Sequence, residues 1–333
     1  MSFSDPESFQ DNSFLNFTLV VAMLGCFGFL ALGPGFENEY AGFGALIALP
    51  MCFGALLTLG SGSYSPLGCL IAPIALGLLC YTLVLLGLEG MVCVVMVMPI
   101  WFLAGLGGGL VALFVLRRQA AERDGGGASV NSVGLAVLPF LLIYAETAAP
   151  PAWDARTVTR SVTIAAPAER IWPLLVSIPK VDASEGIATF THDWLGIPRP
   201  SEALLVTRGD QPVRLAKWGD NARFEEVVTH IAPGHEISWD FAFPDPSLQN
   251  RVDQHVSPDG EMLKIASGSY QLETLDDGRT RVTLSTSYAM RTRFDWYFGF
   301  WGERLLGDVQ DNVLAIVKDR SETAAQAAAR ALR

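Results

Sequence analysis

An abrupt change in composition at Pro150 and Pro151 constrains this chain more than any other feature. Before that point the only basic residues are Arg117, Arg118 and Arg123, which sit in one short loop between long apolar stretches. After it lie the other 20 of the chain's 23 lysines and arginines, spread as in an ordinary water-soluble domain. Lipid excludes charge, so this division predicts a multi-span membrane domain followed by a soluble domain.

Charge and cysteine usage exclude several classes of function. The chain has a formal net charge of −11 and neither half carries a basic face that could neutralise phosphates, which argues against nucleic-acid binding. The five cysteines all lie in the apolar half and form neither a CxxC pair nor a zinc-binding spacing. We therefore expect no metal site, no cofactor and no disulfide framework.

The apolar half is long enough for four or five helical spans, because a bilayer core needs about 20 apolar residues as helix. The stretches predicted as spans are 13–33, 40–60, the two halves of 67–116, and the shorter 130–145. Glu89 interrupts the longest stretch where a hairpin tip would fall. Gly105 and Gly109 have the GxxxG spacing typical of closely packed helices. The pattern predicts an all-α transmembrane bundle of four to five helices over 13–148, after a polar tail at 1–12.

The basic loop also predicts an orientation. Short cytoplasmic loops are enriched in lysine and arginine, so we expect this loop in the cytoplasm. If the chain crosses the membrane once more at 130–145, the soluble domain lies outside the cytoplasm. We therefore expect an integral protein of a bacterial inner membrane with an extracytoplasmic domain. The alternative is a cytoplasmic domain, which follows if 130–145 lies in the interface without crossing. Arg156 and Arg160, just after that stretch, favour the alternative.

In the soluble half, some stretches alternate apolar and polar residues as strands do, and others space their apolar residues as helices do. Residues 158–165 alternate apolar and polar side chains, and Pro167 opens a helix over 168–178. Further strands, separated by turn residues, are predicted at 203–208, 212–218, 223–231, 235–243, 262–275 and 281–290. Apolar residues then recur with the period of one long amphipathic helix, to about residue 321. An alanine-rich tail at 322–333 follows, which we expect to be a frayed helix. This order predicts an α+β domain over 155–321, a curved antiparallel sheet wrapped on the long C-terminal helix.

Three stretches resemble a known superfamily. The run VTIAAPAERIWPLL at 162–175 resembles the opening strand and helix of START-like, helix-grip domains of the SRPBCC superfamily, in its polyketide cyclase/dehydrase and lipid-transport group. FEEVVTHIAPGHEISW at 224–239 resembles their central hairpin, and GRTRVTL at 278–284 resembles their last strand. The resemblance implies a domain that holds a hydrophobic small molecule or lipid in a cavity between sheet and helix. Fusion to a membrane domain favours a lipid or a quinone as the ligand.

Strand alternation identifies side chains that would face such a cavity. Alternate residues of a strand share one face, which groups Phe224 with Glu226 and His230. Tyr270, Tyr288 and His230 are the polar side chains best suited to orient a ligand within an apolar lining. The candidate ligand-binding residues are Phe224, His230, Trp239, Phe241, Tyr270, Tyr288, Phe298 and Trp301. The alternative for each is that it only fills the core.

Catalytic chemistry has less support from the residues present. The histidines are His192, His230, His235 and His255. None of them has metal-ligand spacing, and the chain has neither a GxSxG nucleophile elbow nor a cysteine in its soluble half. We therefore expect a binding domain without catalytic residues. Two alternatives stay open: a cyclase/dehydratase-type enzyme with a buried histidine or carboxylate as general base, and a non-catalytic interaction module of a membrane complex.

Aromatic and basic residues gather where the long helix begins. The group consists of Arg291, Arg293, Trp296, Tyr297, Phe300 and Trp301. Aromatic side chains beside arginines suit the boundary between membrane and water, so we expect this stretch to touch the bilayer. The alternative is that the aromatic rings only pack against the sheet.

Overall fold

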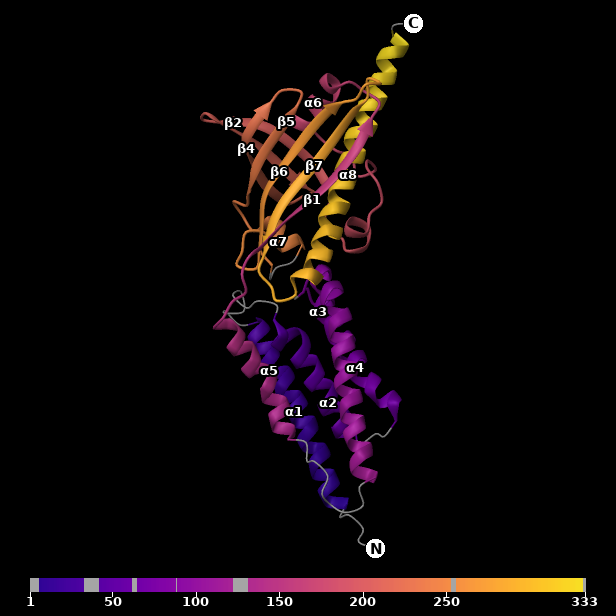
Figure 1. Cartoon of the computed structure of the whole chain (residues 1–333), viewed down its shortest axis with the longest axis vertical. Coiled ribbons are helices and arrows are strands. Elements are labelled where there is room, and N and C mark those ends of the chain that lie inside the picture. Colours follow the sequence, from indigo (N-terminus) through magenta and orange to yellow (C-terminus); the bar gives the residue numbers. More distant parts are fainter. Residues whose placement is uncertain are drawn as a thin grey trace. The chain divides into compact units, whose positions relative to one another are not determined.

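The chain divides into two compact units in a computed structural model that describes residues 6–32, 42–61, 65–87, 89–121, 131–252 and 256–331. One unit is Met1–Ala152 with Thr292–Phe294, and the other is Trp153–Arg291 with Asp295–Arg333. The first is built from helices and the second from a sheet with helices, as Figure 1 shows. We call them the helical unit and the sheet domain.

Apolar helices joined by short connections make up the helical unit. Its elements are α1 (Pro6–Leu32), the π-helix η2 (Gly44–Ala48) with α2 (Leu49–Ser61), the 3-10 helix η3 (Pro66–Leu70) with α3 (Ile71–Leu85), α4 (Met91–Ala121) and α5 (Ser132–Thr147). Glu89 falls between α3 and α4, which confirms the predicted hairpin tip.

Three stretches of the described residues are long and apolar enough to cross a membrane: Gly44–Ser61, Pro66–Leu85 and Met91–Ala120. Phe14–Cys26 and Ser132–Thr147 are apolar but shorter. The expected four or five spans therefore become three by length, because a bilayer core needs about 20 apolar residues. α5 has only 16 residues, and the apolar part of α1 whose side chains the structure describes is only Phe14–Cys26. The three long helices indicate a membrane protein.

Glycines allow α2 and α4 to pack closely. A Cβ on Gly108 would collide with the backbone carbonyl of Met51, and a Cβ on Gly54 would collide with that of Gly105. Small residues let helix backbones approach each other, which matters where lipid removes the hydrophobic drive for helix association. The close packing predicted from the GxxxG spacing is confirmed.

The sheet domain begins with a strand and a short helix and ends with one long helix. Its elements are β1 (Asp154–Ile164), α6 (Ala168–Val176), the π-helix η4 (Phe190–Trp194), β2 (Pro200–Arg208), β3 (Gln211–Trp218), β4 (Ala222–Ala232), β5 (Glu236–Ala242), α7 (Ser247–Val252), β6 (Leu263–Thr274), β7 (Thr280–Met290) and α8 (Asp295–Ala331). The seven strands in the described residues form one antiparallel sheet in the order β1-β7-β6-β5-β4-β3-β2. The predicted α+β class is confirmed for this domain.

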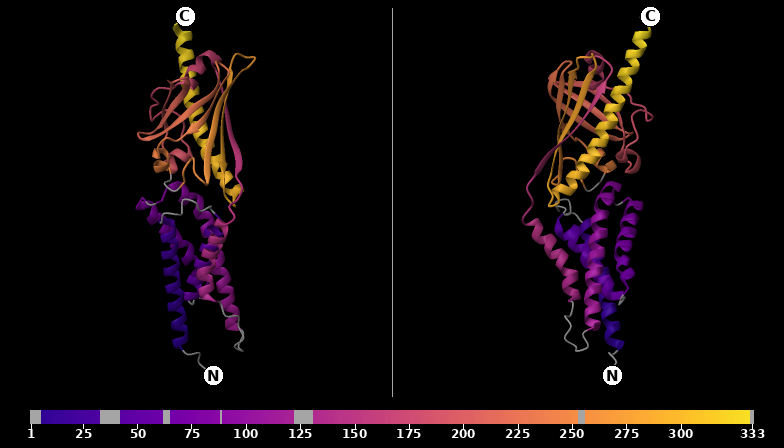
Figure 2. Two further views of the ribbon diagram at one scale, coloured as in Figure 1. Left: turned by 90° about the vertical axis from the view of Figure 1, so that its left-hand side faces the viewer. Right: turned by 45° about the vertical axis from the view of Figure 1, so that its right-hand side comes forward.

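The long helix covers one face of the sheet. α8 contacts β1, β7 and α6, and Figure 2 shows it running along that face. Ile171 and Leu175 of α6 join Leu314 and Val317 of α8 in one core with Ile237 of the sheet. We call the covered face the inner face, because side chains that point from it are enclosed between sheet and helix.

Some element ends differ from the prediction. β1 begins at Asp154 and not at residue 158. α6 ends at Val176 and not at residue 178, because Ile178 leaves the helix to pair with Ala203. α8 continues to Ala331, so the alanine-rich tail is helical, as expected, and extends the same helix.

Candidate functional site

The inner face carries most of the aromatic candidates. Phe224, Trp239, Tyr270 and Tyr288 are each at most 5% exposed. Phe241 is half-buried next to Trp239, with the two ring centroids 6.1 Å apart. These residues come from four different strands, β4 to β7, so strand pairing brings together side chains that are far apart in the sequence.

The two aromatic candidates on α8 have different neighbours. Phe298 packs against a small cluster that contains Val158 and Tyr288. Trp301 faces Phe190 of η4, with ring centroids 6.3 Å apart. α8 therefore places Phe298 against the sheet and Trp301 against the η4 loop.

His230 does not lie on the inner face, and the prediction that it does is wrong. A β-bulge separates Val228, which pairs with Trp239, from His230, which pairs with Ser238. The extra residue shifts the alternation by one position, so the side chain that would point inward points outward. His230 is exposed, whereas Phe224 and Glu226 before the bulge are buried.

A buried ion pair between neighbouring strands lies on the inner face. Arg214 of β3 and Glu226 of β4 occupy paired positions, and the guanidinium Nη1 donates a hydrogen bond to the Glu226 carboxylate. Arg214 also donates from Nε to the carbonyl of Val176, 3.1 Å away. Its Cζ lies 5.1 Å from the ring centroid of Trp239 and 5.7 Å from that of Tyr270. The positive charge is thus held by one carboxylate, one carbonyl and two aromatic faces.

Burial shifts the protonation of this cluster. It raises the pKa of the Glu226 carboxyl above its ordinary value, and the charge of Arg214 works against that rise. Burial also raises the pKa of Tyr270 to about 12, so the phenol stays neutral near pH 7. A carboxyl and a neutral phenol beside one guanidinium, away from water, can hold or relay a proton.

Amide side chains of α8 form a second buried polar row. Gln310 donates from Nε2 to the carbonyl of Val158 and to the hydroxyl of Thr286, both at 3.0 Å. The Asn312 carbonyl oxygen accepts from the backbone N–H of Ile187 at 3.0 Å and from Arg199 at 2.9 Å. These bonds fix α8 to the sheet on one side and to the segment before β2 on the other.

The sheet domain matches a family model. The match covers residues 155–322, just over half of the chain, and the family is described as polyketide cyclase / dehydrase and lipid transport. The chain belongs to this family. A comparison of the chain with curated proteins gives no significant match.

Solved structures similar to this cyclase/dehydrase-family chain include two enzymes. The Zhui aromatase/cyclase from Streptomyces sp. R1128 is 20% identical, with a TM-score of 0.33, and the match covers 53% of this chain and 98% of that one. A truncated norcoclaurine synthase from Thalictrum flavum is 12% identical, with a TM-score of 0.30, and the match covers 50% of this chain and 95% of that one.

Three aromatic side chains of the cyclase/dehydrase-family domain lie together but are not fully enclosed. Trp218, Phe241 and Phe243 are all half-buried. They surround the buried Phe224, with ring centroids between 5.4 and 6.1 Å from its own. α7 adds Leu248 to the same cluster. The inner face is therefore densely packed near α6 and more open around these aromatic rings.

His192 of η4 is buried and neutral. Its Nδ1 lies 2.9 Å from the carbonyl of Ile197, which accepts only if Nδ1 carries the proton. Burial lowers the pKa of this imidazole. Within the described part of the chain, its Nε2 has no hydrogen-bond partner. His255 lies outside the described residues, and among those described no group of three potential ligands could hold a metal ion.

Arg214 was not among the candidate residues predicted from the sequence. Strand alternation placed Glu226 on an inward face but gave it no partner. Arg214 shares the inward face of its strand with Ala216 and Trp218, so a basic residue on that face was visible from alternation alone. Two charges of opposite sign at inward positions of neighbouring strands are the signal that could have identified the pair.

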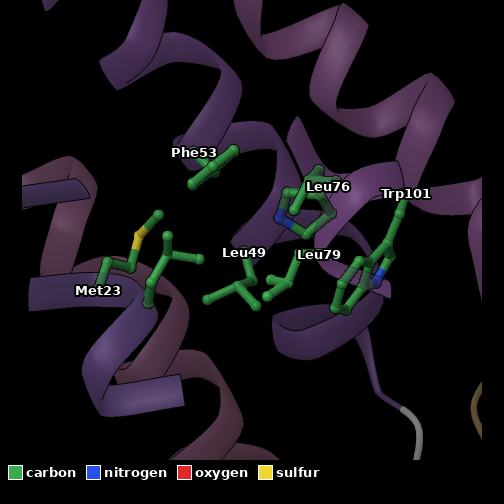
Figure 3. Close-up of a pocket in the computed structure, with 8 residues that line it drawn as sticks. Met23, Leu49, Phe53, Leu76, Leu79 and Trp101 are labelled. Atoms are coloured by element: carbon green, nitrogen blue, oxygen red, sulfur yellow. The ribbon is translucent and has the colours of Figure 1, made fainter. Parts of the chain in front are cut away.

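An apolar hollow lies among the described residues of the helical unit, as Figure 3 shows. Its lining is Met23, Leu24, Leu49, Pro50, Phe53, Leu76, Leu79 and Trp101. A ligand site needs a few polar groups to orient its occupant. This lining offers only the Trp101 indole, so we place the candidate site on the inner face of the sheet domain.

Proposed function

We propose that this protein is anchored in a bilayer by its helical unit and binds a hydrophobic molecule, such as a lipid or quinone, on the inner face of its sheet domain. The observation that carries the proposal is the half-buried cluster of Trp218, Phe241 and Phe243. Each large aromatic side chain gains a few kcal/mol from leaving water, so three half-buried rings side by side leave apolar surface that a ligand could cover. An apolar ligand over these rings would complete their burial.

Polar groups at the edge of this surface would set the orientation of the ligand. Arg214, Glu226 and Tyr270 form a polar cluster around the ring of Trp239, which lies 6.1 Å from that of Phe241. Binding sites for small molecules combine an apolar lining with a few such groups. A molecule with a long apolar body and one polar end, as a lipid or quinone has, fits that combination.

The experiment examines the full chain, purified from host membranes in mild detergent, by native mass spectrometry followed by organic extraction. We expect one hydrophobic molecule per chain that survives detergent exchange. Phe241→Gln, on the inner face, should reduce its occupancy at least fivefold, whereas Asp240→Asn, exposed on the other face of the same strand, should leave it unchanged. An empty wild-type chain, or equal occupancy in both variants, would contradict the proposal and favour an interaction module.

We also propose that the sheet domain is extracytoplasmic in a bacterial inner membrane. This side requires α5 to cross the bilayer, and its 16 residues are short for that task. Reporter fusions after the last residue test the side. A fusion active only outside the cytoplasm supports the proposal, and one active only in the cytoplasm means that α5 does not cross.

A cyclase/dehydratase-type enzyme is the second candidate, and Glu226 is the observation that favours it. A general base in a water-poor site needs a buried titratable group with a shifted pKa, and Glu226 has both properties. If the domain dehydrates its substrate, Glu226→Gln should retain a molecule heavier than the wild-type product by one water. Identical extracted masses from both proteins would count against catalysis by Glu226.

A further inference from the structure

The first turns of α8 expose aromatic residues that the sheet does not cover. Trp296 is 69% exposed and Phe300 is 63% exposed, although the sheet domain buries most of its other large aromatic side chains. They lie four residues apart, so they stand one above the other on the same helix face. The same face continues with Glu303 and Arg304, which are exposed and charged. Along this face, the aromatic surface therefore changes to charged surface within about two turns.

This end of the sheet domain is the one attached to the apolar helices. Asp154, the first residue of β1, pairs with Met290, the last residue of β7, and α8 begins five residues later. The starts of β1 and α8 therefore lie at the same end. Only residues 148–153 connect the end of α5 to β1, and a segment that short reaches about 25 Å at most.

A third aromatic residue at this end lies between two cations. Trp153 is 38% exposed, and its ring centroid is 5.3 Å from Nζ of Lys264 and 5.7 Å from Cζ of Arg291. Tryptophan with lysine or arginine is the combination enriched where membrane proteins pass through the headgroup region. Glu261, 3.6 Å from Arg291, and the exposed Asp295 place negative charge beside these cations and the exposed Arg293, which weakens their attraction for anionic lipid.

We propose that this end, formed by Trp153, Lys264, Arg291, Trp296 and Phe300, sits in the headgroup region of a phospholipid bilayer. The proposal rests on the membrane anchoring proposed above. Trp296 and Phe300 enter the boundary between headgroups and acyl chains, and Glu303 and Arg304 stay in water. Because acidic residues stand beside the cations, we expect the contact to depend on the aromatic side chains and to form on zwitterionic lipid.

The experiment uses the full chain in nanodiscs of zwitterionic phospholipid with either plain or brominated acyl chains. The emission of Trp296 is obtained as the difference between the wild-type chain and Trp296→Phe. We expect brominated lipid to reduce that emission at least twofold and aqueous iodide to leave it almost unchanged. Quenching by iodide and not by brominated lipid would overturn the proposal.

Trp194 provides the matched control, because it is 80% exposed but is not among the residues of the proposed contact. It is the last residue of η4, which extends along α8 from Trp301 to Asp308. The emission of Trp194, obtained as the difference between the wild-type chain and Trp194→Phe, should be quenched by iodide and not by brominated lipid. Equal bromine quenching of both residues would overturn a contact confined to the attached end. A chain that fails to enter nanodiscs would contradict the membrane anchoring itself. Ligand occupancy is measured in a separate experiment. Failure of the anchoring, of ligand binding and of the headgroup contact can therefore be told apart.

Discussion

The helical unit and the sheet domain place their polar atoms in opposite ways. The buried polar residues described in the helical unit are Asn16 and Thr58, and its outer surface carries apolar side chains such as Leu103 and Phe114. The sheet domain is charged outside and encloses an arginine, a glutamate, an aspartate and two amides. An apolar exterior with close backbone contacts is the arrangement that lipid favours, whereas a charged exterior suits water and leaves buried polar groups in need of partners. The close contacts between α2 and α4 depend on glycine, and each of the five polar side chains named in the sheet domain makes at least one hydrogen bond.

The largest expected effect comes from breaking the buried pair. Arg214→Met leaves Glu226 without a partner in an apolar interior, which should destabilise the sheet domain by about 3–5 kcal/mol. The double variant Arg214→Met with Glu226→Leu removes both charges and should recover most of that loss. Urea unfolding of the full chain, followed by tryptophan fluorescence, measures both. A double variant less stable than the single one would show that the pair has a different role.

Glycine packing in the helical unit should give the next largest effect. Gly108→Ala directs a methyl group into the carbonyl of Met51 and should cost about 1–3 kcal/mol through overpacking. Gly107→Ala is the matched control, because a Cβ there meets no atom within 4 Å. It should be neutral or slightly stabilising, since alanine favours helix. Thermal unfolding in detergent compares the two, and equal losses would refute the close approach of α2 and α4.

A pH effect tests the enclosed histidine of the sheet domain. Because burial lowers the folded-state pKa of His192 below its ordinary value of 6.5, the unfolded chain takes up a proton first as pH falls. Its contribution to stability is therefore complete above pH 6.5 and is lost as pH falls through the lowered pKa, with a slope of at most about 1.4 kcal/mol per pH unit. His192→Asn keeps a donor for the Ile197 carbonyl and should flatten this slope. An unchanged slope in urea titrations at several pH values would argue that His192 takes up its proton at the same pH in the folded and unfolded states.

Exposed polar contacts should matter least. The hydroxyls of Thr159 and Ser285 lie 3.1 Å apart across β1 and β7 on the exposed face. Thr159→Val removes this hydrogen bond where water can replace it, so the free energy of unfolding should change by no more than about 0.5 kcal/mol. A loss above about 1 kcal/mol in the same urea assay would mean that the outer face carries more of the stability than the comparison implies.

Much of the fold was predictable because its signals are local. The change at Pro150 separated apolar from soluble sequence, and strand alternation predicted each strand of the sheet to within a few residues. The inward positions of Phe224, Trp239, Tyr270 and Tyr288 followed from the same alternation. Their role in ligand binding stays a prediction.

The positions of His230 and Ile178 depended on contacts that no local pattern contains. His230 has the same sequence spacing from Phe224 that an inward residue would have, but one bulge residue turns it outward. Ile178 has the apolar character of its helix, but pairing with Ala203 removes it from α6.

The sequence by itself determined the division into an apolar and a soluble half, the order of helices and strands, and the family of the soluble half. These depend on composition, on periodicity and on short motifs, all of which act within one segment. Only the tertiary structure decided that Arg214 meets Glu226, that His192 is buried, and that Trp296 and Phe300 are left uncovered. Burial and partnership are set by which distant segments pack together, because a side chain's environment is made by its neighbours in space.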